Sequence, residues 1–156
     1  MDYNIVYLNE SQMNEIETQL DEFDQKHIPY KMEGNISIGI EHNGQIIAGL
    51  NACITAFRIL YVSTVFVQED FRRKGLGRAM MSAMECEAEK MGVDIIRLDT
   101  FDYQGVNFYK SLDYKIVGHY TNKTDNFEEF FFIKYLPQIK KSSAGALDSE
   151  NASHSP

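Results

Sequence analysis

Residues 72–78 read Arg-Arg-Lys-Gly-Leu-Gly-Arg, and they lie where an apolar run at 61–67 gives way to a long helical pattern. Two glycines at such a turn let the backbone bend tightly and approach a ligand with no Cβ in the way. The helix that follows would present unpaired N–H groups and the positive end of its dipole. Because four of these seven residues are cationic, the stretch predicts a phosphate-binding turn.

Bulk composition limits the class of protein. A chain of 156 residues with 44% apolar and 24% charged residues is typical of one globular domain. The net charge of −8 argues against a general nucleic-acid binder, which needs a basic face. No run approaches the roughly 20 apolar residues of a membrane span, and the N-terminus lacks signal-peptide features, so we expect a soluble cytoplasmic protein with no membrane partner. Cys53 and Cys86 fit no metal-ligand spacing, and no metal is expected.

The first half of the chain predicts a strand, a helix and an antiparallel sheet. Residues 3–8 alternate enough for a short strand, and a helical pattern then runs from Ser11 to about Lys26. Asn43-Gly44 is a strong hairpin signal between two strand-like runs. The expected strands are 36–41, 45–54 and 60–67, and the helix has apolar residues Met13, Ile16, Leu20 and Phe23 near one face.

The second half predicts a crossover and a closing pair of strands. A helical pattern follows the glycine turn and stops at Gly92, and residues 94–101 then form an apolar, β-branched run. A strand–helix–strand unit places 60–67 and 94–101 parallel. We expect a short helix at 106–112, strands at 115–120 and 127–135, one domain over 1–136 and a disordered polar tail over 137–156. The predicted fold class is therefore α/β (α+β): a mostly antiparallel central sheet of six to seven strands with a central parallel pair, flanked by three to four helices.

This element order carries two motifs that resemble those of the GNAT superfamily of N-acetyltransferases. Arg72, Gly75 and Gly77 occupy the defining places of a motif similar to that family's acyl-CoA signature, Arg/Gln-x-x-Gly-x-Gly/Ala. Val106–Tyr114 resembles the second family motif, Phe-Tyr-x-x-x-Gly-Phe/Tyr. The resemblance covers roughly residues 1–136, and two motifs about 30 residues apart on a matching element order are more specific than one glycine turn.

The resemblance implies acetyl-CoA as a co-substrate, without a metal. It implies that backbone amides of 73–78 bind the pyrophosphate, that the cations add charge, and that one edge of the strand before the turn binds the pantetheine amides. It also implies that the two central parallel strands splay apart at their C-terminal ends. The expected cofactor-binding residues are Val65, Phe66, Val67, Arg72, Arg73, Lys74, Gly75, Leu76, Gly77, Arg78 and Asn107.

The implied reaction is acetyl transfer to a primary amine by direct attack in a ternary complex. Tyr109 matches the family tyrosine that protonates the coenzyme A sulfur, and a backbone N–H of Phe66 or Val67 is the oxyanion candidate. Asp99 is the catalytic carboxylate that we expect, with Asp102 beside it and Glu128 and Glu129 as second choices. The place of a glutamate found in some family members holds Tyr61 and Ser63.

The chain departs from the family pattern at two positions. Tyr103 stands where the family commonly has asparagine, and Asp113 stands at a usual glycine, where aspartate tolerates a left-handed backbone.

The acidic composition favours a small cationic amine as the acceptor, with a protein N-terminus or lysine as alternatives. The resemblance also implies a homodimer as one assembly, formed through the C-terminal strands. The competing function is a non-catalytic acyl-CoA-binding sensor of the same fold.

Overall fold

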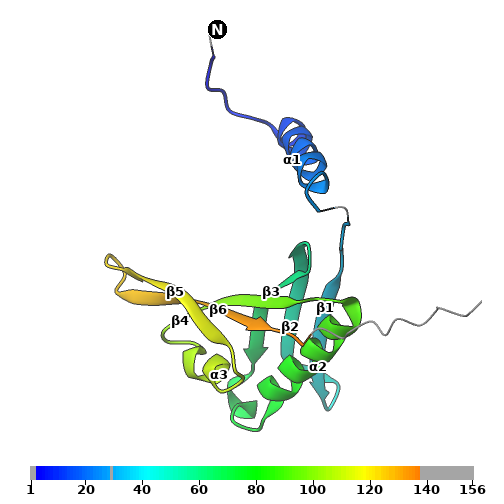
Figure 1. The fold of residues 1–156 in the computed structure, drawn as a ribbon. Coiled ribbons are helices and arrows are strands. Elements are labelled where there is room, and N and C mark those ends of the chain that lie inside the picture. Colours follow the sequence, from blue (N-terminus) through cyan, green and yellow to red (C-terminus); the bar gives the residue numbers. More distant parts are fainter. Residues whose placement is uncertain (1–2, 29, 138–156) are drawn as a thin grey trace, which may run out of the picture.

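The computed structural model describes residues 3–28 and 30–137, and its main body is a six-stranded sheet with the order β1-β2-β3-β4-β6-β5 (Figure 1). β3 and β4 form the parallel pair and the other neighbouring strands are antiparallel. This confirms the predicted fold class, with three α-helices among the described residues. The strands are β1 (Asn35–His42), β2 (Gln45–Ala56), β3 (Ile59–Val67), β4 (Ile95–Phe101), β5 (Lys115–Asn122) and β6 (Phe127–Tyr135); the helices are α1 (Glu10–Gln25), α2 (Leu76–Met91) and α3 (Val106–Lys110), with a 3-10 turn, η1 (Glu69–Phe71).

Three turns that the sequence predicts have the left-handed backbone conformations that their residues favour. Asn43 and Gly44 both have positive φ, 51° and 76°, as a tight hairpin between β1 and β2 requires. Gly92 ends α2 in the left-handed conformation, φ 83°, and its N–H bonds back to the helix. Asp113 takes φ 66°, which confirms that aspartate adopts the left-handed backbone at this turn.

The central parallel strands pair over only part of their length. β3 and β4 are in register from Ile59 with Ile95 to Val62 with Leu98, and the pairing stops there. β3 continues to Val67 and β4 to Phe101, and the pairing of β2 with β3 shifts register just after Val62. Such a bulge leaves Ser63 as the extra residue and bends the strand. The C-terminal ends of β3 and β4 therefore separate, which is the splay that the resemblance implied.

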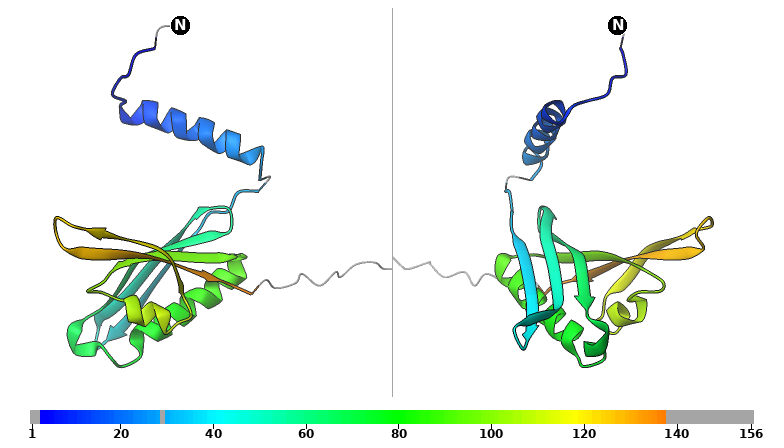
Figure 2. Two further views of the ribbon diagram at one scale, coloured as in Figure 1. Left: turned by 60° about the vertical axis from the view of Figure 1, so that its left-hand side comes forward. Right: turned by 180° about the vertical axis from the view of Figure 1, so that it is seen from behind.

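One face of the sheet packs against α2 and α3. Buried methionines of α2, Met80, Met81 and Met84, join Tyr109 of α3 and the inward residues of the strands in one apolar cluster. Leu60, Leu98 and Phe132 alternate with residues on the other face, as a sheet covered on one side requires. The two helices lie on the same side of the sheet in both views of Figure 2. The core therefore lies between this face and α2, with α3 at the splayed ends of β3 and β4.

The N-terminal part of the chain stands apart from this body. α1 has a capping box in which Asn9 and Gln12 exchange side-chain to backbone hydrogen bonds of 3.0 Å, so the helix begins where its sequence directs. None of its residues is buried, and it lies away from the sheet in every view (Figures 1 and 2). The strand expected at 3–8 does not form: residues 3–9 belong to no strand or helix.

The C-terminal end of the described chain closes the body. Leu136 is buried, and its N–H donates to the carbonyl of Asp94 at 2.9 Å. The tail predicted over 137–156 lies, from residue 138 on, outside the described residues. Within the described part of the chain, no helix is both long and apolar enough to cross a bilayer.

Candidate active site

A pocket of about 960 Å³ opens where β3 and β4 separate. One side is the free end of β3, the second is the turn leading into α2, and the third is β4 with the start of α3. It is lined by Val62–Val67, Phe71, Arg72, Arg73, Gly75–Arg78, Asp99, Thr100, Tyr103, Gln104, Gly105, Phe108 and Tyr109. The structure therefore brings most of the sequence-predicted residues together around one cavity.

The glycine turn at the N-terminus of α2 is held in an unusual backbone conformation. Arg73 and Gly75 have φ of 58° and 81°, both left-handed, and Gly75 is the N-cap of α2. Gly77 has a different role: a Cβ there would lie 3.1 Å from Cζ of Phe108 in α3. The first turn of α2, including Leu76, therefore packs close to α3 and directs its unpaired N–H groups into the pocket region.

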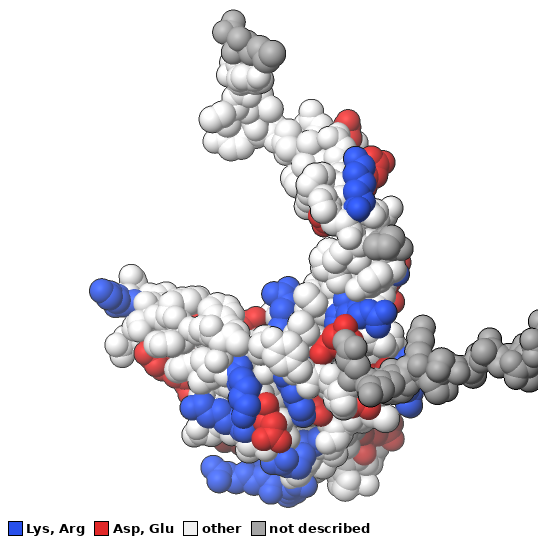
Figure 3. Space-filling view, in the orientation of Figure 1, with Lys and Arg blue, Asp and Glu red and all other residues white. Residues whose placement is uncertain are grey.

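The four predicted cations of the turn separate into different roles. The Nε–H of Arg72 donates to the Val67 carbonyl at 3.0 Å, and Arg78 donates to Ser111 Oγ at 3.1 Å. Arg72, Arg73 and Arg78 line the pocket, whereas Lys74 lies over the ring of Phe71 at 5.0 Å and is not part of the lining. Figure 3 shows positive side chains gathered at the lower end of the body, where α2 begins. This end of the pocket is suited to an anion.

The free end of β3 supplies an unpaired backbone edge. Val65, Phe66 and Val67 pair with β2 on one side and face the pocket on the other, because β4 has diverged. Amides on such an edge can hydrogen-bond an extended ligand as a strand would. The Val67 carbonyl already accepts from Arg72, so this contact joins the end of the strand to the turn.

Tyr109 lines the pocket from α3. It is the buried residue of α3 and packs against Tyr114 and Phe132, with ring centroids 6.1 and 5.8 Å away. Burial, together with the charge of Asp99, raises the pKa of the Tyr109 phenol to about 12. The hydroxyl is therefore a proton donor at neutral pH.

Asp99 is the predicted carboxylate that reaches the pocket. It is half-buried on β4, and its Oδ2 accepts a hydrogen bond of 2.8 Å from the Tyr61 hydroxyl of β3. That hydrogen bond, with burial, raises the pKa of Tyr61, so the phenol remains a donor to Asp99. Arg97 stacks over the same Tyr61 ring at 5.0 Å. Asp99 is therefore held in one orientation beside the separating strands.

The other predicted carboxylates have different partners. Asp102 accepts from the N–H of Tyr103 at 2.8 Å and stabilises the turn after β4. Glu128 accepts from Thr121 on β5, and Glu129 accepts from the Tyr120 hydroxyl. None of these three side chains lines the pocket.

Tyr103 and Asn107, which lie before and within the second motif, differ in whether they line the pocket. Tyr103 lines the pocket and stacks on Phe101, with ring centroids 5.5 Å apart, although its side chain is largely exposed. Asn107 is exposed on α3 and does not line the pocket. Its assignment as a coenzyme A contact thus gains no support from the pocket geometry.

Sequence reasoning missed the turn that places Tyr109. Gln104 Oε1 accepts from the Thr100 hydroxyl at 3.2 Å and from the Phe101 N–H at 3.1 Å, and the Gly105 N–H donates to Thr100 Oγ1 at 3.3 Å. A Cβ on Gly105 would lie 2.9 Å from Cε2 of Tyr109. Gly105 was the available signal, because a glycine directly before a short helix often marks a close approach.

Comparison with known proteins agrees with this geometry. The model of the acetyltransferase (GNAT) family matches residues 4–114, which is most of the chain. The chain belongs to the GNAT family of acetyltransferases. The match begins within the N-terminal segment that stands apart from the sheet, and it ends at Tyr114, after the second motif.

Individual relatives are more distant. The chain is 32% identical over 54 residues to L-ornithine N5-acetyltransferase NATA1 of Arabidopsis thaliana, a match that spans 33% of this chain and only 24% of that enzyme. A crystal structure of an acetyltransferase from Bacillus cereus ATCC 14579 superposes with a TM-score of 0.78 at 22% identity, covering 86% of this chain and 98% of the other. An aminoglycoside 6′-N-acetyltransferase complexed with coenzyme A gives 0.61 at 17% identity, covering 78% and 82%. These structural likenesses show the GNAT fold.

Proposed function

We propose that this acetyltransferase uses acetyl-CoA to acetylate the primary amine of a small cationic molecule, by direct attack within a ternary complex. The observation that carries the proposal is one continuous pocket that is lined both by the glycine turn with its cations and by Tyr109 and Asp99. A sensor that only binds an acyl-CoA would need the turn but would not need Tyr109 and Asp99.

The proposed binding mode places each part of acetyl-CoA against a complementary surface. The N–H groups of residues 73–78 and the cations Arg72, Arg73 and Arg78 would hold the phosphates. The free edge of β3 at Val65–Val67 would bind the pantetheine amides. A pocket of about 960 Å³ is within the upper range of ligand sites and is large enough for this extended molecule. This assignment leaves out Lys74 and Asn107, neither of which lines the pocket.

The proposed chemistry needs one proton acceptor and one proton donor. The amine nitrogen attacks the thioester carbonyl carbon, the C–N bond forms and the C–S bond breaks. Asp99 accepts the proton that the amine loses, and the Tyr109 hydroxyl donates its proton to the departing sulfur. The resulting Tyr109 phenolate regains a proton through solvent, and Asp99 releases one. A backbone N–H of Phe66 or Val67 would stabilise the oxyanion of the tetrahedral intermediate.

The acceptor side of the proposal rests on charge and on the relatives. Asp99 would attract an ammonium group towards the separated strands before the amine loses its proton. The L-ornithine and aminoglycoside acetyltransferases to which the chain is similar are named for small amino compounds. A small molecule with more than one amino group is therefore the acceptor class that we propose.

Thiol release from acetyl-CoA in the presence of candidate amines tests this function. The panel is ornithine, a polyamine, an aminoglycoside and a peptide with a free N-terminus. Cys86 is exposed and would react with a thiol reagent, so the assay uses Cys86→Ser as the parent protein. We expect release with one amine class, and a fall of about 100-fold or more in kcat in Tyr109→Phe with little change in the acetyl-CoA dissociation constant.

The matched control is Tyr114→Phe. Tyr114 is also buried and adjacent to Tyr109, but its hydroxyl donates to Glu85 Oε1 at 3.0 Å, and neither Tyr114 nor Glu85 lines the pocket. It should lose stability while retaining kcat. Turnover that is equal in Tyr109→Phe and the parent would contradict the acid role. Tight acetyl-CoA binding without release for any amine would favour the sensor.

A further inference from the structure

Residues 3–28, here called the N-terminal arm, expose an apolar surface that residues 30–137 do not cover. Ile5 is fully exposed, and Met13, Ile16, Leu20 and Phe23 form a stripe along α1 with Leu20 57% exposed. These four positions recur at the spacing of one helix face. Soluble chains rarely leave so many large apolar side chains together in water, so the arm is expected to have a binding partner.

The sheet has a matching uncovered surface. The face opposite α2 and α3, here called the open face, carries side chains that the strand register places side by side: Tyr61 next to Arg97, Arg97 next to Ile133, and Ile95 next to Tyr135. Tyr135 is 70% exposed and Phe131 is also exposed. No helix of the described residues lies on this face in either view of Figure 2. A sheet face with this many apolar side chains normally packs against another element.

The charges of α1 and of one part of the open face are complementary. α1 contains six acidic residues and no lysine or arginine, so its apolar stripe is bordered by negative charge. The open face has the exposed cation Arg97 near its centre, and Lys115 lies in register with Ile133. Asp99, in register with Phe131, and Glu129, in register with Phe101, lie further along the same face. Opposite charges across an interface favour the correct pairing and its orientation.

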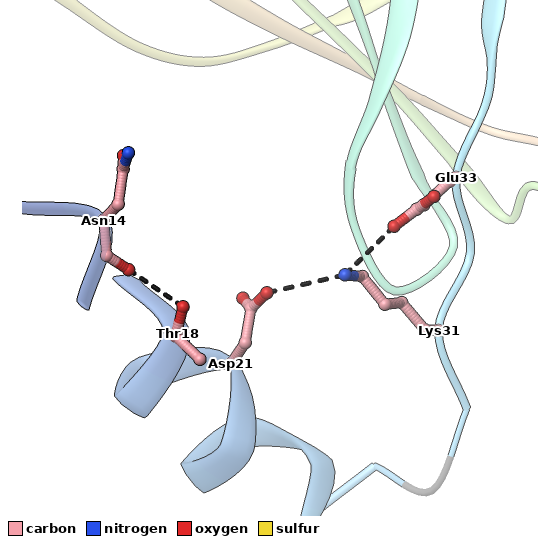
Figure 4. A network of polar contacts seen from close by, with 5 residues as sticks. All are labelled: Asn14, Thr18, Asp21, Lys31 and Glu33. Atoms are coloured by element: carbon pink, nitrogen blue, oxygen red, sulfur yellow. Dashed lines mark hydrogen bonds and ion pairs between the residues drawn. The ribbon is translucent and has the colours of Figure 1, made fainter. Parts of the chain in front are cut away.

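Contacts at the base of the arm direct it away from its own sheet. Lys31 binds Asp21 of α1 at 3.5 Å and Glu33 of the linker at 3.0 Å (Figure 4). Tyr30 lies 5.2 Å below the Arg58 guanidinium at the β2–β3 turn. Each of these exposed contacts is weak. The Lys31–Asp21 contact, which joins α1 to the linker, favours the present direction of the arm, and packing on a neighbouring molecule would leave it in place.

We propose that the N-terminal arm of each copy packs on the open face of a second copy, so that the protein is a homodimer formed by arm exchange. The family match begins at residue 4, so the arm is part of the domain that relatives share and not an added tail. Exchange of an identical element is a low-cost route to a two-fold dimer. An arm of this length also fits the roughly 20–30 residues that each partner contributes to a standard interface. The inference does not depend on acetyl transfer.

Light scattering coupled to size-exclusion chromatography on the full chain tests the proposal. The wild-type protein should have twice the 18.0 kDa mass of one chain. Leu20→Asp places a charge in the apolar stripe and should give the mass of a single chain. Thr18→Asp adds the same charge on the opposite face of α1, where the Thr18 hydroxyl donates to the Asn14 carbonyl of its own helix (Figure 4), and should remain dimeric.

A second variant identifies the surface to which the arm binds. Arg97→Glu reverses the charge of the open face and should also give monomers. Thermal unfolding of each variant shows that the body remains folded, because Leu20 and Arg97 are both exposed. A monomeric wild type would overturn the proposal, as would a Leu20→Asp protein that stays dimeric. Dissociation by Leu20→Asp but not by Arg97→Glu would overturn the assignment of the open face.

Discussion

Substitution of Gly105 by alanine tests whether the position of Tyr109 controls the chemistry. A Cβ at Gly105 would lie 2.9 Å from Cε2 of Tyr109. Carbon atoms pack at about 3.5–4.0 Å, so the ring must move by at least about 0.6 Å. The ring is 8% exposed and packs against Phe132, so it cannot swing freely into solvent. The hydroxyl at its far end must therefore shift within the pocket.

The size of the effect follows from this displacement. A misplacement of about 1 Å in a reacting group can cost about 100-fold in rate. We therefore expect kcat of Gly105→Ala to fall about 10- to 100-fold, which corresponds to about 1.4–2.7 kcal/mol of activation free energy. Overpacking should also lower the free energy of unfolding by about 1–3 kcal/mol. Acetyl-CoA affinity should change little, because the turn that we propose to bind the phosphates is not the site of the substitution.

Steady-state kinetics with saturating acceptor, together with calorimetry for acetyl-CoA, measures these quantities. Gly118→Ala is the control, because its Cβ would meet Phe131 at an ordinary 3.8 Å. If Gly105→Ala acts through Tyr109, then Gly105→Ala combined with Tyr109→Phe should be no slower than Tyr109→Phe alone. This reasoning would be refuted if the kcat of the double variant fell by the product of the two single-variant factors. It would also be refuted if Gly105→Ala had the wild-type kcat.

Three further predictions concern cofactor binding, alkaline stability and the core. Arg72→Ala removes both a cation that lines the pocket and the 3.0 Å contact to the end of β3, and calorimetry should show acetyl-CoA binding at least about tenfold weaker. Lys74→Ala, outside the pocket lining, should have a smaller effect. In the folded state Tyr109 keeps its proton up to a pKa of about 12, whereas the ordinary pKa of a tyrosine phenol is 10.0. The buried, protonated phenol therefore contributes its full stabilisation at pH values below 10. Denaturant titrations should therefore show the free energy of unfolding falling by up to about 2–3 kcal/mol between pH 10 and 12. The fall should be smaller in Tyr109→Phe, which lacks this phenol. Glu85→Ala should lower the free energy of unfolding by about 2–4 kcal/mol in urea titrations, because it leaves the partly buried ammonium of Lys134, 2.8 Å from Glu85 Oε2, without its partner; a loss below 0.5 kcal/mol would contradict this.

The features that the sequence predicts well are those set by neighbouring residues. Asn43-Gly44 specifies its hairpin because the required positive φ values are local, and Gly75 and Gly92 act at the two ends of α2 for the same reason. The parallel pair follows from the short crossover through α2. These signals were sufficient for the fold class and for the position of the glycine turn at the start of α2.

Features that depend on contacts between distant residues were less predictable. The hydrogen bond from Tyr61 to Asp99 joins residues 38 positions apart, and no local pattern predicts it. The four apolar residues predicted to lie near one face of α1 are typical of a buried helix face, yet no residue of α1 is buried in the structure. An amphipathic pattern shows that a helix needs a partner but does not say which one. The strand expected at 3–8 is absent for a related reason. Alternating apolar and polar residues favour a strand, but a strand is stable only when a neighbouring strand is available to pair with it.

The short pairing of β3 with β4 also determines how the backbone exchanges hydrogen with solvent. Beyond Val62 and Leu98 the amides that face the gap lack a partner on the other central strand. In the free protein these N–H groups should exchange with deuterium much faster than those at residues 59–62, although both belong to one strand. A ligand that occupies the edge completes the ladder and slows their exchange. The deuterium content of residues 63–67 would thus report occupancy of the site in a protein that performs no turnover.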